Sequence, residues 1–314
     1  MRAAPHCRVS LSIPLENHRP NSYKHGRYWP RTLYWPMGRH DQFREGAPRE
    51  PPLARKVSFM VIATLPRFLQ HGKTGGLIRL GRDHDGGYVV SEADVLAADI
   101  LITLGIADDW SFERDFAAKN DIPIIAYDGS VGTEIFVRTF FRTLYRHPAK
   151  PRRWMKDLKL ILGFVRFFGG PGRSHVGKFV SLDNVGNHVA MEKVLSDTDS
   201  DRIFLKIDIE ESEYMALEAI LACQDRITAL VIEFHECAAR LDAIRDFVSR
   251  FSLPLVHIHA NNWSPVDGES GLPLTMELTF SRSSVPGEEV AVYPCELDMP
   301  NNRDLPEIVL TFES

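Results

Sequence analysis

Short apolar runs alternate with amphipathic stretches along most of this chain. Runs of four to eight mainly apolar residues, each closed by polar or turn-forming residues, are typical of buried strands, and the amphipathic stretches between them are typical of helices. Strands that alternate with helices predict an α/β fold with a mostly parallel sheet between two helical layers. The predicted strands are 99–103, 122–128, 178–183, 203–207, 229–234, 255–259, 275–281 and 308–312.

The stretch from Ile203 to Leu217 is the most informative of these units. Its strand ends in two carboxylates, Asp208 and Glu210, and a helix pattern follows, with apolar residues at i, i+3 and i+7. Glu213 is expected in the first helical turn, where negative charge suits the positive helix end. In open α/β sheets, ligands bind beyond the carboxyl ends of the strands, so Asp208 is expected at a functional site.

Two earlier strands also end in residues suited to ligand binding. The strand at 99–103 runs into Leu104 and Gly105, where the chain can turn tightly, and then into Asp108 and Asp109. These two carboxylates would repel a phosphate, which favours a cationic ligand over a dinucleotide. The next strand ends at Asp128, and a carboxylate at that place can accept hydrogen bonds from both hydroxyls of a ribose.

Two histidines follow later strands. The period of two residues along a strand places Glu233 and His235 on one face, and likewise His257, His259 and Asn261. Either histidine taken alone is typical of a hydrogen-bonded structural residue. If three consecutive βα units share one carboxyl edge, however, Asp208, His235 and His259 meet there and form a site.

Two further segments supply candidate binding residues. The sequence from Leu77 to Val90 predicts a strand, a tight Asp-Gly-Gly turn and a second strand. It is either a plain hairpin or a rim that brings Asp85 and Tyr88 to a ligand. Asp183, at the end of the run 178–183, is a candidate for contact with an adenine edge.

Residues 133–178 form a basic insertion with two predicted amphipathic helices. Eleven arginine and lysine residues face only Glu134 and Asp157, and aromatic residues lie between them. The insertion is either a solvated cover over the sheet, a lid for an anionic or lipid-linked substrate, or a surface that contacts a membrane. It contains no nucleic-acid-binding module, so nucleic acid is not expected as a partner.

Composition narrows the class of protein. The chain has 314 residues and a net charge of −5, which suits one large α/β domain at 56–314 with an appended tail. Residues 1–55 are rich in proline and arginine and are expected to be a poorly ordered tail or a basic arm. The four scattered cysteines and the lack of a membrane span or signal-peptide pattern indicate a cytoplasmic protein.

Four motifs resemble those of FkbM-type methyltransferases. Lys206 to Glu213 is similar to the family pattern K-I-D-x-E-G-x-E, with Glu211 where the family has glycine. Arg79 to Tyr88 resembles R-x-G-x-x-x-D-G-G-Y, and the strand ends at 233–235 and 257–262 resemble E-F-H and H-x-H-x-N-N. The resemblance extends over about 77–312.

This resemblance implies an S-adenosylmethionine-dependent O-methyltransferase with a Rossmann-like three-layer sandwich and one antiparallel strand in its sheet. Its acceptor would be a hydroxyl of a small molecule, a sugar or a glycan- or lipid-linked compound. His235 is the first candidate for the base, Asp208 orients it or replaces it, and His259 is the reserve. A divalent metal held by Asp208, His235 and His259 is a rival that is not favoured. The residues implied at the cofactor are Gly105, Asp108, Asp128, Asp183 and Asp85.

Two other classes remain open. A nicotinamide-dependent oxidoreductase or epimerase would use a similar sheet, but the G-x-G-x-x-G pattern that marks its cofactor loop is missing. A catalytically silent scaffold would keep the fold and bind an anionic partner through the insertion.

Overall fold

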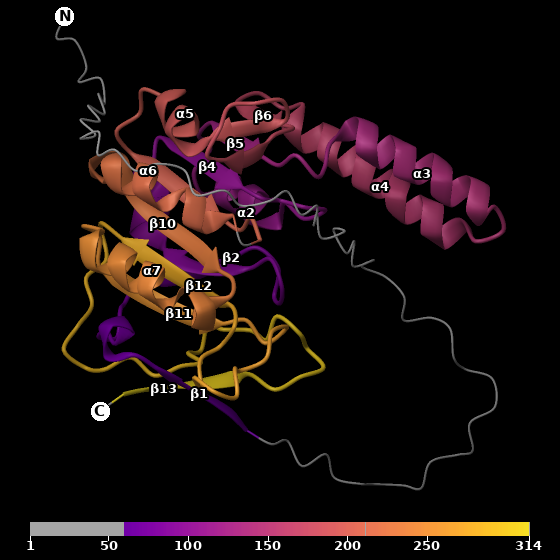
Figure 1. Cartoon of the computed structure of the whole chain (residues 1–314). Helices are drawn as coiled ribbons and strands as arrows, with labels where there is room; N and C mark the ends of the chain where they lie inside the picture. Colours follow the sequence, from indigo (N-terminus) through magenta and orange to yellow (C-terminus); the bar gives the residue numbers. More distant parts are fainter. Residues whose placement is uncertain (1–59, 211, 314) are drawn as a thin grey trace, which may run out of the picture. The chain divides into compact units, whose positions relative to one another are not determined.

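The computed structural model describes residues 60–210 and 212–313. Its centre is a seven-stranded sheet in the order β11-β12-β10-β9-β4-β5-β6 (Figure 1). All neighbouring pairs are parallel except the two that β12 makes with β10 and β11. The strands are β4 (Ile100–Leu104), β5 (Ile124–Tyr127), β6 (Arg173–Val176), β9 (Ile203–Ile207), β10 (Ile227–Phe234), β11 (Leu255–Ala260) and β12 (Met276–Ser281).

The fold is the predicted Rossmann-like α/β sandwich, and side-chain alternation along the central strands explains its three layers. Every residue of β4 and β9 is buried, as expected for parallel strands covered on both faces. Ile102 and Leu205 pack into one core with α5 (Met191–Ser196), α6 (Leu217–Ala222) and α7 (Cys237–Arg250). Leu101 and Phe204 point the other way, into a second core with α1 (Glu92–Ala97) and α2 (Ser111–Lys119).

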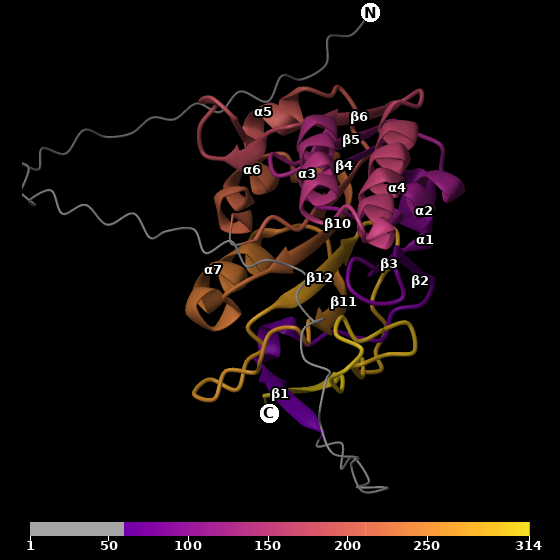
Figure 2. The same ribbon diagram turned by 90° about the vertical axis from the view of Figure 1, so that its right-hand side faces the viewer.

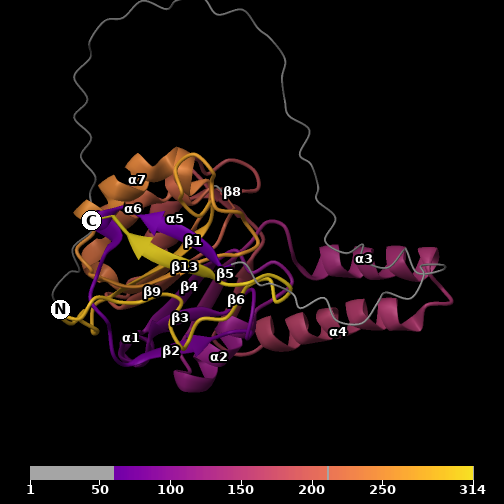
Figure 3. The ribbon, with the colours of Figure 1, turned by 90° about the horizontal axis from the view of Figure 1, so that it is seen from below.

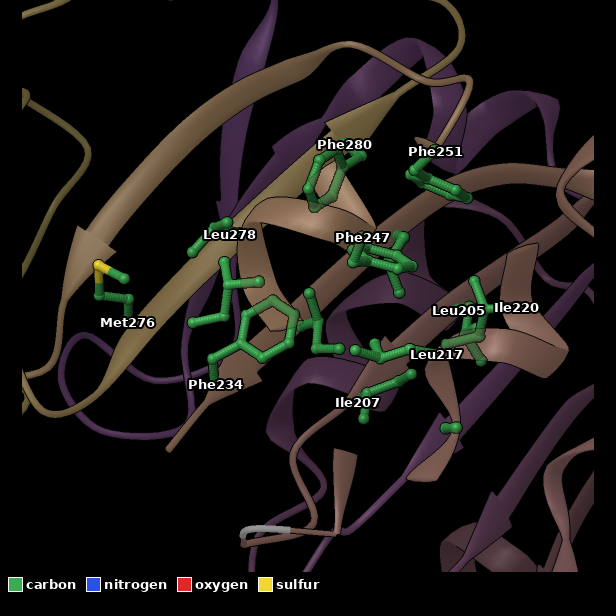
Figure 4. Close-up of a cluster of buried hydrophobic side chains, with 14 of the residues drawn as sticks. Leu205, Ile207, Leu217, Ile220, Phe234, Phe247, Phe251, Met276, Leu278 and Phe280 are labelled. Carbon is green, nitrogen blue, oxygen red and sulfur yellow. The ribbon is translucent and has the colours of Figure 1, made fainter. Parts of the chain in front are cut away.

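The first of these cores is rich in aromatic and branched aliphatic side chains (Figure 4). Phe247 of α7 packs edge-on against Phe280 of β12 and stacks on Phe251. Phe234 ends β10 in the same cluster, next to Tyr214. The strand end that leads into His235 is therefore anchored by packing.

Smaller elements surround the sheet. Three separate two-stranded sheets pair β1 (Val61–Leu65) with β13 (Ile308–Phe312), β2 (Leu77–Leu80) with β3 (Tyr88–Ser91), and β7 (Phe179–Ser181) with β8 (His188–Ala190). Short 3₁₀ helices are η1 (Arg67–Leu69), η2 (Glu213–Met215) and η3 (Gln224–Arg226). Two long helices, α3 (Thr133–Arg146) and α4 (Pro151–Phe168), come after β5 and before β6 in the chain and lie side by side (Figures 2 and 3).

The structure corrects two predictions about elements. The third strand of the parallel series is β6, inside the segment that we assigned to the insertion, whereas 179–181 pairs with β8 outside the central sheet. The helix expected directly after Asp208 is split into η2 and the short α6. The expected tail at 1–55 and Glu211 lie outside the described residues.

Within the described part of the chain, no helix is long and apolar enough to cross a membrane. No disulfide joins the cysteines found there.

Candidate functional site

The strand order reverses between β4 and β9. From β4 the chain proceeds outward through β5 and β6 on one side, and from β9 through β10 on the other. In open α/β sheets, such a switch point opens a crevice at the carboxyl ends of the strands, where ligands bind. Gly105 follows β4 and Asp208 follows β9, so the two residues lie on either side of the switch point.

The main chain is unusually close at this point. Gly105 has a φ of +78°, and a Cβ built on it would lie 1.7 Å from the carbonyl oxygen of Asp208. The amide of Asp208 donates to the carbonyl of Leu104, and Lys206 Nζ donates to the carbonyl of Gly105. Only glycine fits at position 105, because the backbone there is left-handed and the Asp208 carbonyl leaves no room for a side chain.

Backbone strain gathers at the same edge. Three non-glycine residues of the described chain have positive φ: Ala107, Glu210 and Glu236. Each follows the end of one of three neighbouring strands, β4, β9 and β10, within three residues. Residues in this conformation cost free energy and concentrate at functional sites, so the pattern marks this edge independently of side-chain chemistry.

Carboxylates converge beside this strained edge. The buried hydroxyl of Tyr88 lies 2.8 Å from Asp208 Oδ2 and 3.3 Å from Glu233 Oε2. Glu277 is the cross-strand partner of Glu233 and accepts a hydrogen bond from Asn301 Nδ2 at 2.9 Å. We call Asp85, Asp208, Glu233 and Glu277 the acidic cluster.

The acidic cluster is electrostatically coupled. The pKa of Glu233 is raised well above its usual range, first by burial and then by the charges of Asp208 and Glu277. Burial of its carboxyl also raises the pKa of Asp85, a hydrogen bond from Asn301 opposes that change, and the charge of Asp208 adds to it. The predicted rim residue Asp85 thus belongs to the same cluster as Asp208. A cluster with this excess of negative charge favours a cationic ligand.

His235 is held in one orientation beside the cluster. Its backbone amide and its Nδ1 both lie within hydrogen-bond distance of Glu213 Oε1, at 2.6 and 3.2 Å. Its carbonyl accepts a hydrogen bond from the hydroxyl of Tyr214 at 2.6 Å. Its Nε2 is directed to the cluster, 3.7 Å from Glu233 Oε1. Burial alone would lower the pKa of His235, but Glu213 and the nearby carboxylates outweigh it and raise the pKa.

Glu213 is a functional candidate that sequence reasoning misjudged. It was expected only in the first turn of a helix, and it does begin η2, but its side chain is fully buried and bonds to His235. The signal was present, because Glu213 is the last residue of the motif that begins at Lys206. Glu233 was noticed as sharing a face with His235 and as part of the motif at 233–235, but its place in the acidic cluster was not predicted.

His259 does not join Asp208 and His235 in one group of side chains, as was expected, but contacts the acidic cluster from the other side, through Glu277. β10 and β11 are both antiparallel to β12 and so run in the same direction, which places their carboxyl ends at the same edge of the sheet with β12 between them. His259 is buried against its cross-strand partner Glu277, with Nδ1 at 3.3 Å from Glu277 and Nε2 at 3.4 Å from Glu307. Both ring nitrogens are engaged, and these carboxylates raise its pKa well above the usual range despite burial.

The structure groups a different set of possible metal ligands from the predicted Asp208, His235 and His259. Among the described residues, Asp208, Glu233 and His235 can each offer one ligand atom, and these atoms lie within 4.8 Å of one another. A second group with the same property, His257, Cys295 and Asp298, lies around the buried 2.9 Å ion pair between His257 and Asp298.

The remaining predicted cofactor residues have local roles in this structure. Asp128 accepts hydrogen bonds from the amides of Ile106 and Ala107 and from the amide and hydroxyl of Ser130. These four bonds fill its acceptor sites and shape the loop after β4, so a ribose would have to displace one of the donors. Asp108 is exposed on that loop, and Asp183 is exposed and bonds to Ser181.

Asp109 occupies the start of α2. Its carboxylate accepts hydrogen bonds from the amide and hydroxyl of Ser111 at 3.0 Å and pairs with Arg82 at 2.8 Å. The anion-binding position at this helix start is therefore taken by the protein's own carboxylate, as expected for a site that does not receive a phosphate.

Comparison with known proteins gives only distant likenesses. No family model matches the sequence, and no curated protein matches it. The solved structures that align with it include a rRNA methylase from Streptococcus thermophilus, a precorrin-6y C5,15-methyltransferase from Geobacter metallireducens, and WbdD.

The rRNA methylase aligns at 10% identity and a TM-score of 0.32, covering 60% of this chain and 92% of its own. The precorrin methyltransferase aligns at 11% identity and a TM-score of 0.33, covering 61% of this chain and 88% of its own. WbdD aligns at 12% identity and a TM-score of 0.34, covering 60% of this chain and 38% of its own. Likenesses at this level carry no information about substrate, and the expectation that nucleic acid is not a partner stays a prediction.

Replacing Gly105 by alanine should destabilise the fold by about 3 kcal/mol. The left-handed backbone costs ~1–2 kcal/mol for alanine, and the clash with the Asp208 carbonyl adds to it. Urea unfolding measures the change. Gly268→Ala is the matched control, because no atom lies within 4 Å of its added Cβ, and its unfolding free energy should change by less than about 1 kcal/mol. Equal stability of the two variants would contradict the close approach.

Proposed function

We propose that this protein transfers a methyl group from S-adenosylmethionine to a hydroxyl of an acceptor molecule. The observation that carries the proposal is the acidic cluster beside Gly105 at the switch point of the sheet. S-adenosylmethionine carries a sulfonium and an ammonium and has no phosphate, which suits an edge rich in carboxylates. The resemblance of 206–213 and 233–235 to the FkbM motifs supports the same reaction.

The residues present fit this cofactor. Glycine at 105 leaves room for close approach to the main chain, and the carboxylates of the acidic cluster match cationic groups. A nicotinamide cofactor fits less well, because Asp109 already occupies the start of α2, where its pyrophosphate would bind. We therefore place the predicted oxidoreductase or epimerase second.

His235 is the proposed base. Bound S-adenosylmethionine would supply an activated methyl on sulfur. His235 Nε2 would take the proton of the acceptor hydroxyl as the oxygen of that hydroxyl receives the methyl group. Glu213 holds Nδ1 and stabilises the imidazolium that results, the role predicted for Asp208. Asp208, tied to Tyr88, instead adds negative charge on the cofactor side.

A divalent metal is the alternative use of the same residues. Asp208, Glu233 and His235 offer oxygen and nitrogen ligands, and a metal-bound histidine commonly donates its other nitrogen to a carboxylate, as His235 can to Glu213. Such a metal would acidify the acceptor hydroxyl, so no base would be needed.

Calorimetric titration of the full chain tests the cofactor. S-adenosylmethionine should bind and NADH should not. Binding of NADH alone would favour the oxidoreductase, and binding of neither would favour the silent scaffold; either result would overturn the proposal.

The dependence of turnover on pH tests the base. The reaction needs neutral His235, so turnover should rise with pH through a pKa above the ordinary value of about 6.5. Glu213→Gln removes the charge that raises this pKa, so the rising limb should move to lower pH. His235→Ala should lower turnover by about 10²–10⁴-fold.

The variants need a control and a chelator arm. Glu92→Gln on α1 removes the partner of the exposed Lys119 on α2 and should leave the pH profile unchanged. A rising limb that Glu213→Gln does not move would remove His235 as the base. Loss of wild-type turnover on chelation, with recovery on adding Mg²⁺ or Mn²⁺, would instead assign His235 to the metal.

A further inference from the structure

The helical hairpin formed by α3 and α4, residues 133–168, has an inner side that packs well. Phe136 and Phe164 are buried against each other and against the loop after β4, through Ile106 and Trp110. Farther along the hairpin, Phe140 meets Trp154 edge-on. The two helices therefore pack on one another, and the end of the hairpin nearest the sheet packs on the candidate cofactor loop.

The outer side of α4 carries an apolar stripe. Met155, Leu158, Leu162 and Val165 follow one another at i, i+3, i+7 and i+10, so they share one face of the helix. All four are exposed, and Leu162 exposes 60% of its surface. This stripe lies apart from the packed positions Phe164 and Phe168. Exposed aliphatic side chains in such a row mark an interaction surface.

α3 adds exposed aromatic side chains to the hairpin. Phe141 and Tyr145 stand one helical turn apart, and Tyr145 exposes 89% of its surface. Aromatic rings with a polar end are common where a protein meets the boundary between lipid and water.

The hairpin is also strongly basic. It carries nine basic side chains, all exposed, and two acidic ones. Within the described chain, the salt bridges of the hairpin are limited to Arg138 with Glu134. The basic residues are Arg138, Arg142, Arg146, Lys150, Arg152, Arg153, Lys156, Lys159 and Arg166.

The charges border the apolar stripe. On a helix with 100° per residue, Arg152, Lys156, Lys159 and Arg166 fall within about 100° of the stripe's edge, on the side away from the packed face. The positive charges also act at the tip of the hairpin, on His147. Its pKa is lowered first by burial and then by the neighbouring basic side chains Arg153, Lys150 and Arg146. Apolar and basic stripes side by side are the pattern of a helix that lies in a membrane interface.

We infer that the α3–α4 hairpin docks on an anionic lipid bilayer. The basic side chains match anionic headgroups, and the aliphatic stripe reaches the acyl boundary below them. Nucleic acid would use the charges but has no place for methionine, leucine and valine. Pairing of this hairpin with the hairpin of a second copy, or with the arginine-rich residues 1–55, would bring positive charge to positive charge.

The docked hairpin would lie on the membrane surface and would not cross the bilayer. α4 has 18 residues and measures about 27 Å, but basic residues interrupt it every few positions. If the proposed methyl transfer is accepted, docking on a bilayer also indicates the class of acceptor molecule. Because the hairpin root packs on the candidate cofactor loop, a docked protein would find its hydroxyl acceptor on a lipid-linked molecule.

Vesicle sedimentation of the full chain tests the docking. The protein should bind phosphatidylcholine vesicles that contain phosphatidylglycerol, and weakly or not at all to vesicles of phosphatidylcholine alone. Each neutralised charge is worth about fivefold in partitioning, so Lys156→Gln with Lys159→Gln should weaken binding about 25-fold. Leu162→Asp should weaken it by about tenfold or more, because one exposed leucine no longer reaches the acyl boundary.

Leu96→Asp is the matched control. Leu96 on α1 exposes 59% of its surface, as Leu162 does on α4, and its change should leave vesicle binding intact. Failure to bind anionic vesicles, or equal loss in both leucine variants, would overturn the docking. So would hairpin-dependent binding of an RNA oligonucleotide, or self-association, in place of vesicle binding.

This experiment is independent of catalysis. If the chain binds vesicles but not S-adenosylmethionine, the docking stands and the proposed function fails. If it binds S-adenosylmethionine but not vesicles, the function stands and the lipid-linked acceptor fails.

Discussion

The close approach of two main-chain segments, at Gly105 and at the Asp208 carbonyl, is the constraint on which the site depends. A side chain at position 105 would separate the ends of β4 and β9, and the crevice at the switch point would lose its shape. The neighbouring strained residues Ala107, Glu210 and Glu236 are held by the same packed strand ends. The free energy for this strain comes from the two cores on either side of the sheet, where Ile102 and Phe204 are buried.

The order of the strands explains why carboxylates gather at this edge of the sheet. Because β9, β10 and β12 lie next to one another, Asp208, Glu233 and Glu277 are brought together although they are far apart in sequence. Burial of like charges is unfavourable unless protons or a cation compensate them, and the raised pKa of Glu233 expresses that cost. A cationic ligand would relieve the same repulsion, which links the architecture of the sheet to the choice of cofactor.

Much of the fold could be predicted from sequence because each central strand is a short apolar run buried on both faces. The exception, β6, lies at the edge of the sheet and contains Ser174 and His175, so its pattern does not indicate a buried strand. The two helices of the insertion were also predicted, since α3 and α4 carry a strong helical periodicity.

The positions of the candidate site residues could be predicted only where they directly follow the end of a strand. Asp208, His235 and Gly105 follow neighbouring strands and meet as expected. His259 ends a strand at the same edge, but β12 separates that strand from β10, which the sequence pattern does not reveal. Glu213 shows the opposite limit, because a glutamate in a helical pattern indicates a solvated charge unless its buried partner is known.

The affinity of the chain for S-adenosylmethionine and for its neutral product, S-adenosylhomocysteine, tests most directly whether the acidic cluster selects a cation. A carboxylate about 6 Å from a sulfonium at an effective dielectric of about 20 contributes roughly 2–3 kcal/mol. Asp208→Asn should therefore weaken binding of S-adenosylmethionine by about tenfold or more and change binding of the neutral product little. Equal weakening of both ligands, or of neither, would contradict the selection of a cation by charge.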